Sequence, residues 1–328
     1  MRILIVGKGS IGIRHAKIFY ELNCEVSFLR ANKSTLGNKF KYKFKEYFKI
    51  NEIKNFFFDL IIICNPTSLH VLTLKKLVKF SNNFFIEKPI AASSRDLKKL
   101  ILLKKKFKLN IFSGFMMRQD PKIIYIKKKI INLKKKTRVT HFVWRTYLPD
   151  WHPYENYRNS YAFKKNLGGG VIRTCCHEID MAIFLNGPII SVSTYRVRDN
   201  LNGKIEGSVI IILVHVNKSI SNILLDFSSK IFERYFNLSI GQYLIKWIYN
   251  KNYIKINNRN YVKKINFKNC SVDNFYILQN KKILYKIKNL NKKKIKKQMS
   301  KEWRKILSTE HTIIKCLNSL QNFKQKIL

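Results

Sequence analysis

The placement of its glycines constrains this chain more than any other feature. It has 12 glycines in 328 residues, and half of them lie in two short segments, ILIVGKGSIGIRH near the N-terminus and NLGGGVIRTCCHEID beyond the middle. Glycine is needed where the backbone takes a positive φ or approaches a ligand closely. The distribution therefore predicts two functional places, a dinucleotide site at the first segment and a catalytic site at the second.

The first segment has the pattern G-x-G-x-x-G between an apolar strand, RILIVG, and a helix predicted over residues 10–21. In this context the first glycine allows the turn, the second lets the backbone approach a pyrophosphate, and the third lets the helix pack on the strand. The free N–H groups and positive end of the helix attract phosphates. We expect NAD or NADP to bind along Gly7, Gly9, Ser10, Ile11 and Gly12.

The end of the second predicted strand, CEVSFLR, bears on the choice between these two cofactors. NAD-binding sites usually place Asp or Glu near this point, on the ribose 2′-hydroxyl. This chain has Arg30 there and Lys33 shortly after it. Two cations without a carboxylate favour a 2′-phosphate, so the sequence predicts NADP slightly ahead of NAD. Arg30 carries more of this prediction, because lysine is abundant throughout the chain.

The order of predicted elements indicates an α/β protein of two domains. Apolar strands alternate with helices through residue 118, with strands such as DLIIIC and NIFSGF and helices near 68–80 and 93–108. This alternation is typical of a doubly wound parallel sheet. Later strands, PIISVSTYRVR to ERYFNLSIG, follow one another without helices between them. We therefore predict a Rossmann domain over 1–118 and, over 119–328, an α+β domain with an open-faced, largely antiparallel sheet and a helical C-terminal tail.

The formal charge of +46 is a weak guide to partners. Lysines are spread along the whole chain and are enriched together with Asn, Ile, Phe and Tyr, which is typical of a compositional bias. Aromatic residues do not alternate with them as in RNA-binding segments, so we expect no nucleic-acid partner. Apolar runs are shorter than a bilayer span and the N-terminus shows no cleavable signal. The six cysteines form no C-x-x-C pair, which favours reduced thiols in a cytoplasmic protein with no membrane partner.

Four segments together resemble one known family. They are GKGSIGIRH, NPTSLH at 65–70, EKP at 87–89 and GGGVIRTCCHEID at 168–180, in that order. The chain resembles the glucose–fructose oxidoreductase/inositol dehydrogenase (Gfo/Idh/MocA) family. LPDWHPYENYRNSYAFKKNLGGG is similar to its branch associated with cell-surface sugar synthesis. The resemblance implies a Rossmann domain followed by an open-faced sheet domain, and reversible hydride transfer between a nicotinamide and a sugar, nucleotide-linked sugar or similar alcohol. It also implies a homo-oligomer joined through the open sheet face.

Two segments at strand ends supply the candidate residues of the first domain. Ligands of parallel sheets bind beyond the carboxyl ends of the strands, where Lys88 follows an apolar strand. A partly buried lysine near a cationic nicotinamide would have a lowered pKa and could exchange a proton with a hydroxyl. The resemblance implies a cis Lys88–Pro89 bond and a turn beside the nicotinamide. We expect Glu87 to orient Lys88 or to bind cofactor. The expected cofactor-binding residues of the turn are Asn65, Pro66, Thr67 and His70.

The second glycine segment supplies the other catalytic candidate, His177, with Asp180 one helical turn away. Histidine titrates near neutrality, which suits a general base. Many family members carry an Asp one turn before this histidine. Here Thr174 stands at that spacing and Arg173 beside it. A threonine can bind a hydroxyl but cannot act as a base, so the alternative is a cofactor-binding regulatory protein with weakened catalysis.

Substrate contacts are expected from residues suited to sugar recognition. Aromatic faces stack on pyranose rings, and arginine pairs bidentately with carboxylate or phosphate. The candidates are Arg118, Trp151, Tyr154, Tyr157, Arg158, Thr174 and Asp180. A packing role for the aromatic segment is an equal alternative. The run Cys175–Glu178 predicts no metal site, because consecutive helical residues point in different directions.

Overall fold

A computed structural model describes residues 1–31, 43–133, 137–151, 156–197, 199, 201 and 205–322. The chain divides into two compact units, Met1–Gly114 with Tyr276–Leu307, and Phe115–Phe275 with Ser308–Leu328. This division differs from a single boundary at residue 118, since a C-terminal segment returns to the first unit. Within the described part of the chain, no helix has the length and apolar character that crossing a bilayer requires.

The first unit contains a six-stranded sheet in the order β3-β2-β1-β4-β5-β6. Every neighbouring pair in it is parallel, as predicted for a Rossmann fold. The strand order reverses direction beside β1, so the loop after β1 lies at the point where such sheets bind ligands. The strands are β1 Arg2–Val6, β2 Glu25–Leu29, β3 Lys45–Tyr47, β4 Leu60–Ile63, β5 Asn83–Ile86 and β6 Asn110–Ser113.

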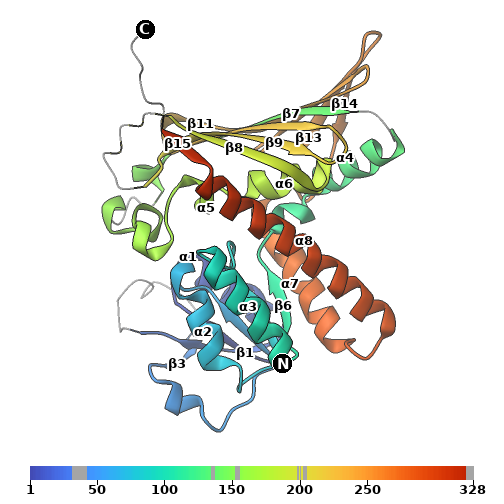
Figure 1. The fold of residues 1–328 in the computed structure, drawn as a ribbon. Helices are drawn as coiled ribbons and strands as arrows, with labels where there is room; N and C mark the ends of the chain where they lie inside the picture. Colours follow the sequence, from blue (N-terminus) through green and yellow to red (C-terminus); the bar gives the residue numbers. More distant parts are fainter. Residues whose placement is uncertain are drawn as a thin grey trace. The chain divides into compact units, whose positions relative to one another are not determined.

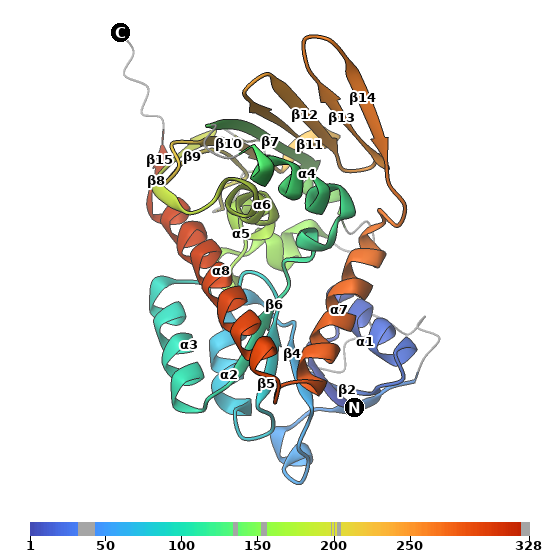
Figure 2. The same ribbon diagram turned by 90° about the vertical axis from the view of Figure 1, so that its right-hand side faces the viewer.

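Helices cover both faces of this sheet (Figure 1; Figure 2). In Figure 2, α2 and α3 lie on one side of it, and α1 and α7 on the other. Ile283 and Leu284 of α7 are buried in one cluster with Ile3, Ile5 and Phe85, which explains why the C-terminal segment joins the first unit. The helices are α1 Ser10–Glu21, α2 His70–Leu77, α3 Ser94–Lys106, α7 Val272–Lys288 and α8 Lys293–Asn318, the last two crossing the division between units.

The second unit is built on a nine-stranded sheet in the order β14-β13-β12-β11-β7-β10-β9-β8-β15. Most pairs are antiparallel, and β10 pairs in parallel with β7. Helices α4 and α6 lie against one face (Figure 2), so the expected open-faced sheet is confirmed. The strands are β7 Arg138–Tyr147, β8 Ile189–Val197, β9 Ser208–His215, β10 Ile220–Asp226, β11 Ser228–Ile240, β12 Tyr243–Ile248, β13 Tyr253–Asn257, β14 Val262–Asn266 and β15 Leu320–Asn322.

The segment 171–186, within and after the second glycine run, is not one continuous helix. It forms a short turn, α5 Val171–Thr174, and a longer helix, α6 His177–Asn186. The break puts His177 at the first position of α6 and not inside a continuous helix. Another helix of this unit, α4 Pro121–Asn132, begins at its proline, a residue suited to the first helical turn.

A buried charge pair fixes the start of α4 against the sheet. Asp120 caps the helix by accepting a hydrogen bond from the Lys122 backbone N–H at 2.8 Å, and it accepts another from Trp247 Nε1 at 2.9 Å. The Lys122 side chain is fully buried, with Nζ 3.6 Å from the Asp120 carboxylate and bonded to the carbonyls of Ile248, Tyr249 and Lys251. Burial raises the pKa of Asp120 and lowers that of Lys122. Burial disfavours the charged form of both side chains, and the ion pair between them favours it.

Replacing Lys122 by Met is expected to lower the free energy of unfolding by about 3–5 kcal/mol, because Asp120 is left as an unpaired buried charge. Adding Asp120→Asn removes that charge and keeps one oxygen, which can still accept the capping bond from the backbone N–H of residue 122, while the bond from Trp247 to the other oxygen is lost. The double variant should therefore be more stable than Lys122→Met alone. Chemical denaturation of the four proteins of this cycle measures the coupling. A double variant no more stable than Lys122→Met would show that the charge pair is not the cause.

Candidate active site

The glycine loop after β1 has the geometry that a bound pyrophosphate needs. A Cβ on Gly12 would lie 2.2 Å from the carbonyl oxygen of Gly7, so only glycine lets α1 approach the loop this closely. Gly9 precedes α1 in an extended conformation, and no described side chain caps the helix there. Ser10 and Ile11 begin α1. The N–H groups of its first turn are thus available to an anion, as NAD or NADP requires.

The two glycines Gly12 and Gly9 should respond differently to the same added methyl group. Gly12→Ala is expected to lower both thermal stability and cofactor binding, because its Cβ meets backbone. Gly9→Ala adds a Cβ with no described atom within 4 Å, so it should keep its stability and lose cofactor affinity. Thermal unfolding and titration with NADH measure the two effects separately.

Gly9→Ala serves as the matched control for the steric effect at Gly12. Normal cofactor affinity in Gly9→Ala would contradict the placement of the pyrophosphate on this loop. Normal stability in Gly12→Ala would contradict the close approach of α1.

The loop and the neighbouring strands carry a group of three charges. Glu46 of β3 accepts from Lys8 Nζ at 2.6 Å through one carboxylate oxygen and from Arg30 Nη1 at 2.9 Å through the other. Partial burial alone would raise the pKa of Glu46, but its hydrogen bonds and ion pairs with Lys8 and Arg30 lower it. The sequence analysis did not identify Glu46, since no local pattern ties it to Arg30. Lys33, the other expected cation, lies outside the described residues.

The turn after β4 is held by His70. This side chain is buried, with Nε2 2.8 Å from the carbonyl oxygen of Asn65 and Nδ1 3.0 Å from that of Pro89. It therefore connects the two loops predicted to lie beside the nicotinamide. Asn65 in turn donates to Thr73 at 2.7 Å, and Thr67, which follows Pro66, is buried. The geometry gives His70 a positioning role behind the loops.

Stability at mildly acidic pH should report on His70. Burial lowers the pKa of His70, against the opposing effect of the Asn65 carbonyl. The unfolded chain then binds the proton more readily than the folded protein, so the free energy of unfolding falls as the pH drops below about 6.5. We expect His70→Gln to flatten this fall, measured by denaturation between pH 7.5 and 5.

His141→Gln on β7 is the control, because His141 is exposed. Burial also lowers the pKa of His215, so the flattening at His70 should be partial. An unchanged pH dependence in His70→Gln would contradict this assignment.

Lys88 follows β5 at the carboxyl edge of the parallel sheet and is partly exposed. The Lys88–Pro89 bond is cis, as the resemblance implied. Glu87 is buried, and its Oε2 accepts from the Lys88 backbone N–H at 3.1 Å. His15 Nε2 lies 3.0 Å from Glu87 Oε1, and Asn280 Nδ2 lies 3.0 Å from His15 Nδ1. This series of contacts fixes the Glu87 carboxylate and, through it, the backbone of Lys88.

His15 and Asn280 are positioning residues that the sequence analysis missed. His15 stands in the glycine segment, GIRH, so its place in the motif could have identified it. Asn280 lies on α7, far away in sequence, and only the return of that helix to the first unit brings it to His15.

In the second unit, His177 is buried at the start of α6 between aromatic rings. Its ring is edge-on to Phe115 and roughly parallel to Trp144, each with centroids 6.5 Å away. The adjacent Glu178 forms a buried ion pair with Arg234 Nε at 2.7 Å. The Arg234 guanidinium lies 3.7 Å from the Trp144 ring centre. Strands β7 and β11 thus hold the rings and charges that fix the beginning of α6.

Two of the expected substrate contacts bind each other. Arg118 donates to Asp180 Oδ2 from Nε at 2.9 Å and to Oδ1 from Nη2, and Thr309 donates to Oδ1 at 2.7 Å. Asp180 is fully buried, and the Arg118 side chain is 15% exposed. The Asp180 carboxylate fixes the position of the Arg118 side chain. Because Asp180 is fully buried, Arg118 is the more accessible of the two to a substrate.

The glycines before α5 are required by packing inside the second unit. Gly170 has φ +108°, and a Cβ there would lie 2.2 Å from Glu206 Oε1. Thr174 is buried and donates to the Gly170 carbonyl at 2.7 Å, while Arg173 donates to the Gly169 carbonyl at 3.2 Å. The Thr174 hydroxyl therefore has a backbone partner one turn earlier.

The aromatic segment before these glycines packs mainly on its own unit. Trp151 donates to Thr146 Oγ1 at 2.7 Å and stacks on Trp144. Tyr157 contacts Phe163 edge-on, and the exposed Arg158 lies over the Tyr157 ring. Tyr154 lies outside the described residues. This arrangement supports the packing alternative for Trp151 and Tyr157, while Arg158 remains accessible.

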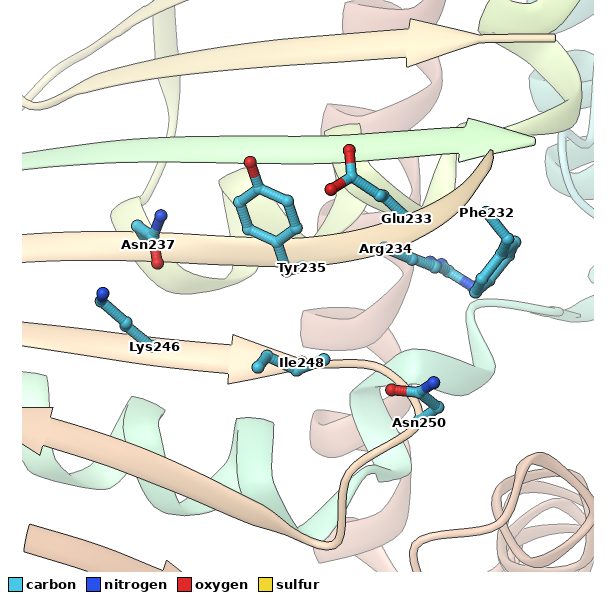
Figure 3. Close-up of a pocket in the computed structure, with 8 residues that line it drawn as sticks. All are labelled: Phe232, Glu233, Arg234, Tyr235, Asn237, Lys246, Ile248 and Asn250. Carbon is cyan, nitrogen blue, oxygen red and sulfur yellow. The ribbon is translucent and has the colours of Figure 1, made fainter. Parts of the chain in front are cut away.

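A hollow of about 340 Å³ opens on β11 and β12 (Figure 3). Glu233, Tyr235 and Asn237 line it from β11, and Lys246 and Ile248 from β12. These residues alternate with the buried Arg234 and Phe236, so the hollow lies on the face opposite α6. Across the described residues, no cluster of three or more His, Cys, Asp or Glu side chains is arranged to hold a metal.

The parallel sheet and its glycine loop define a dinucleotide-binding protein with a second, sheet-based unit. Residues 1–115 match the family described as "Oxidoreductase family, NAD-binding Rossmann fold". This match, to the Gfo/Idh/MocA family, covers the N-terminal segment of the first unit, through β6. The chain is 26% identical over 197 residues to the myo-inositol 2-dehydrogenase of Thermotoga maritima, which covers 57% of this chain and 55% of that protein.

Solved structures share the whole fold at low identity. An oxidoreductase from Agrobacterium radiobacter in complex with NAD+, L-tartaric acid and magnesium has a TM-score of 0.76 and 14% identity, covering 97% of this chain and 96% of that one. The WlbA dehydrogenase from Bordetella pertussis in complex with NADH and UDP-GlcNAcA has a TM-score of 0.75 and 14% identity, covering 97% and 95%. At this identity the likeness establishes the fold.

Proposed function

We propose that this protein is an NAD(P)-dependent dehydrogenase that transfers hydride between a nicotinamide and a carbinol carbon of a sugar or nucleotide-linked sugar. The observation that carries the proposal is Lys88, placed at the carboxyl edge of a Rossmann sheet next to the buried Glu87. A lysine there can exchange a proton with the reacting hydroxyl. The family match over residues 1–115 and the glycine loop support the nicotinamide cofactor.

The substrate class rests on relatives and on residue chemistry. The names of similar proteins include an inositol dehydrogenase and a dehydrogenase crystallised with UDP-GlcNAcA. In this chain Arg118 and Arg158 offer partly exposed guanidinium groups suited to a carboxylate or phosphate. We propose a role in cell-surface carbohydrate synthesis, in the cytoplasm, by a homo-oligomer joined through the sheet face opposite α6.

In the proposed mechanism Lys88 transfers the proton of the substrate hydroxyl, with help from His177. When bound, the nicotinamide supplies or accepts the hydride. Lys88 Nζ takes the hydroxyl proton as the carbinol is oxidised and returns it in the reverse direction. His177 binds a substrate hydroxyl or assists the transfer. Glu87, Asn65, Pro66 and Thr67 line the nicotinamide end, and His70 holds their loops together.

The two cofactors NAD and NADP remain candidates in this proposal. The prediction of NADP rests on Arg30, which the structure pairs with Glu46. Arg30 is therefore already paired with a carboxylate, and binding a cofactor phosphate would compete with that ion pair.

Lys88→Met should bind NADH normally but turn over roughly 10²–10⁴-fold more slowly, the usual loss when general acid–base help is removed. Steady-state assays across a panel of sugars, inositols and nucleotide sugars measure turnover, and fluorescence titration measures binding. Lys98→Met on α3 is the control, since Lys98 is exposed and lies on a covering helix. Turnover near the wild-type level in Lys88→Met would remove Lys88 from the mechanism.

A regulatory protein of the same fold is the second candidate, and Thr174 favours it. The residue at this place cannot act as a base, and its hydroxyl bonds to the Gly170 carbonyl. This candidate predicts that wild-type protein binds NADH tightly yet turns over none of the panel.

A further inference from the structure

We propose that Glu46 is the residue that selects the cofactor, and that it selects NAD(H) over NADP(H). The carboxylate that NAD sites usually place at the end of the second strand comes here from the neighbouring third strand. In this role Glu46 accepts a hydrogen bond from the ribose 2′-hydroxyl and disfavours a 2′-phosphate. The inference rests on the proposed function, since it assumes that a nicotinamide dinucleotide binds along the glycine loop.

The position of Glu46 follows from strand order. β3 pairs in parallel with β2, and Glu46 stands beside Phe28, next to the last pair of that ladder. Arg30 follows β2 directly, and Lys8 lies inside the glycine loop after β1. All three groups therefore gather at the carboxyl edge of the sheet, where a dinucleotide's adenosine ribose binds in Rossmann folds.

Burial shows which charge the group presents outward. The exposed fraction of the side chain is 9% for Arg30, 17% for Lys8 and 23% for Glu46. The carboxylate is the most accessible of the three, and Arg30 and Lys8 bond to it at 2.9 and 2.6 Å. The most accessible group for a ligand here is therefore a hydrogen-bond acceptor. In the sequence, the end of the second strand carries only the cations Arg30 and Lys33.

The charge state strengthens this selection. Partial burial alone would raise the pKa of Glu46, but its hydrogen bonds and ion pairs with Lys8 and Arg30 lower it, which favours the carboxylate form. A carboxylate has about four acceptor positions, so a hydroxyl can bond to it while both cations stay in place. A 2′-phosphate brings up to two negative charges against it and must also draw Lys8 and Arg30 away.

Glu46→Gln tests the proposal directly, with NADH and NADPH titrated separately into the full-length protein. The wild type should bind NADH more tightly than NADPH. Glu46→Gln removes the negative charge that pairs with both cations and repels a phosphate, so NADPH affinity should rise roughly ten- to hundredfold, the range expected for one charged hydrogen bond. NADH affinity should fall by a smaller factor, because an amide oxygen still accepts the hydroxyl.

Glu25→Gln is the matched control. It makes the same change of charge at the opposite end of β2, where Glu25 is 75% exposed, and should leave the ratio of the two affinities unchanged. A wild type that prefers NADPH, or a Glu46→Gln protein with the wild-type ratio, would overturn the role of Glu46 and leave the dehydrogenase proposal intact. Binding of neither cofactor by the wild type would overturn both.

Discussion

The contact between Gly12 and the Gly7 carbonyl is the constraint on which the first unit depends. Helix α1 can lie against the β1 loop only because residue 12 has no side chain. That approach brings His15, one turn further along α1, to the Glu87 carboxylate. Glu87 in turn fixes the backbone of Lys88. The same two glycines therefore shape the predicted pyrophosphate loop and, through α1, the predicted catalytic loop.

Buried polar groups, and not loops alone, hold the candidate residues of both units. In the first unit Asn280, His15 and Glu87 form one connected series. In the second, Arg234 pairs with Glu178 next to His177, and Arg118 pairs with Asp180. A buried polar group left without its partner loses much more free energy than an exposed one. These buried contacts therefore favour one arrangement of the Lys88 backbone in the first unit, and of the start of α6 with His177 in the second.

Both segments are rich in glycine, yet their glycines are used differently. At the first motif the space above Gly9 is open among the described atoms, which suits a ligand. At the second, the space beside Gly170 is filled by Glu206 of the same unit. The second motif thus serves internal packing, and its value for function lies in where it places His177. A run of glycines in the sequence therefore does not show whether the space beside it holds a ligand or a neighbouring part of the protein.

The sequence by itself determined the Rossmann sheet, the open-faced second sheet and most element positions, because these follow from local periodicity, glycine turns and caps. Helix α1 spans the predicted residues 10–21. The sequence also identified Lys88 and His177 as candidates, because each stands in a distinctive local motif. Tertiary structure alone decided the rest. The return of α7 with Asn280, the pairing of Arg118 with Asp180 and the placing of Glu46 beside Arg30 join residues far apart in the chain. Such contacts depend on strand order and packing, which no local pattern of residues records.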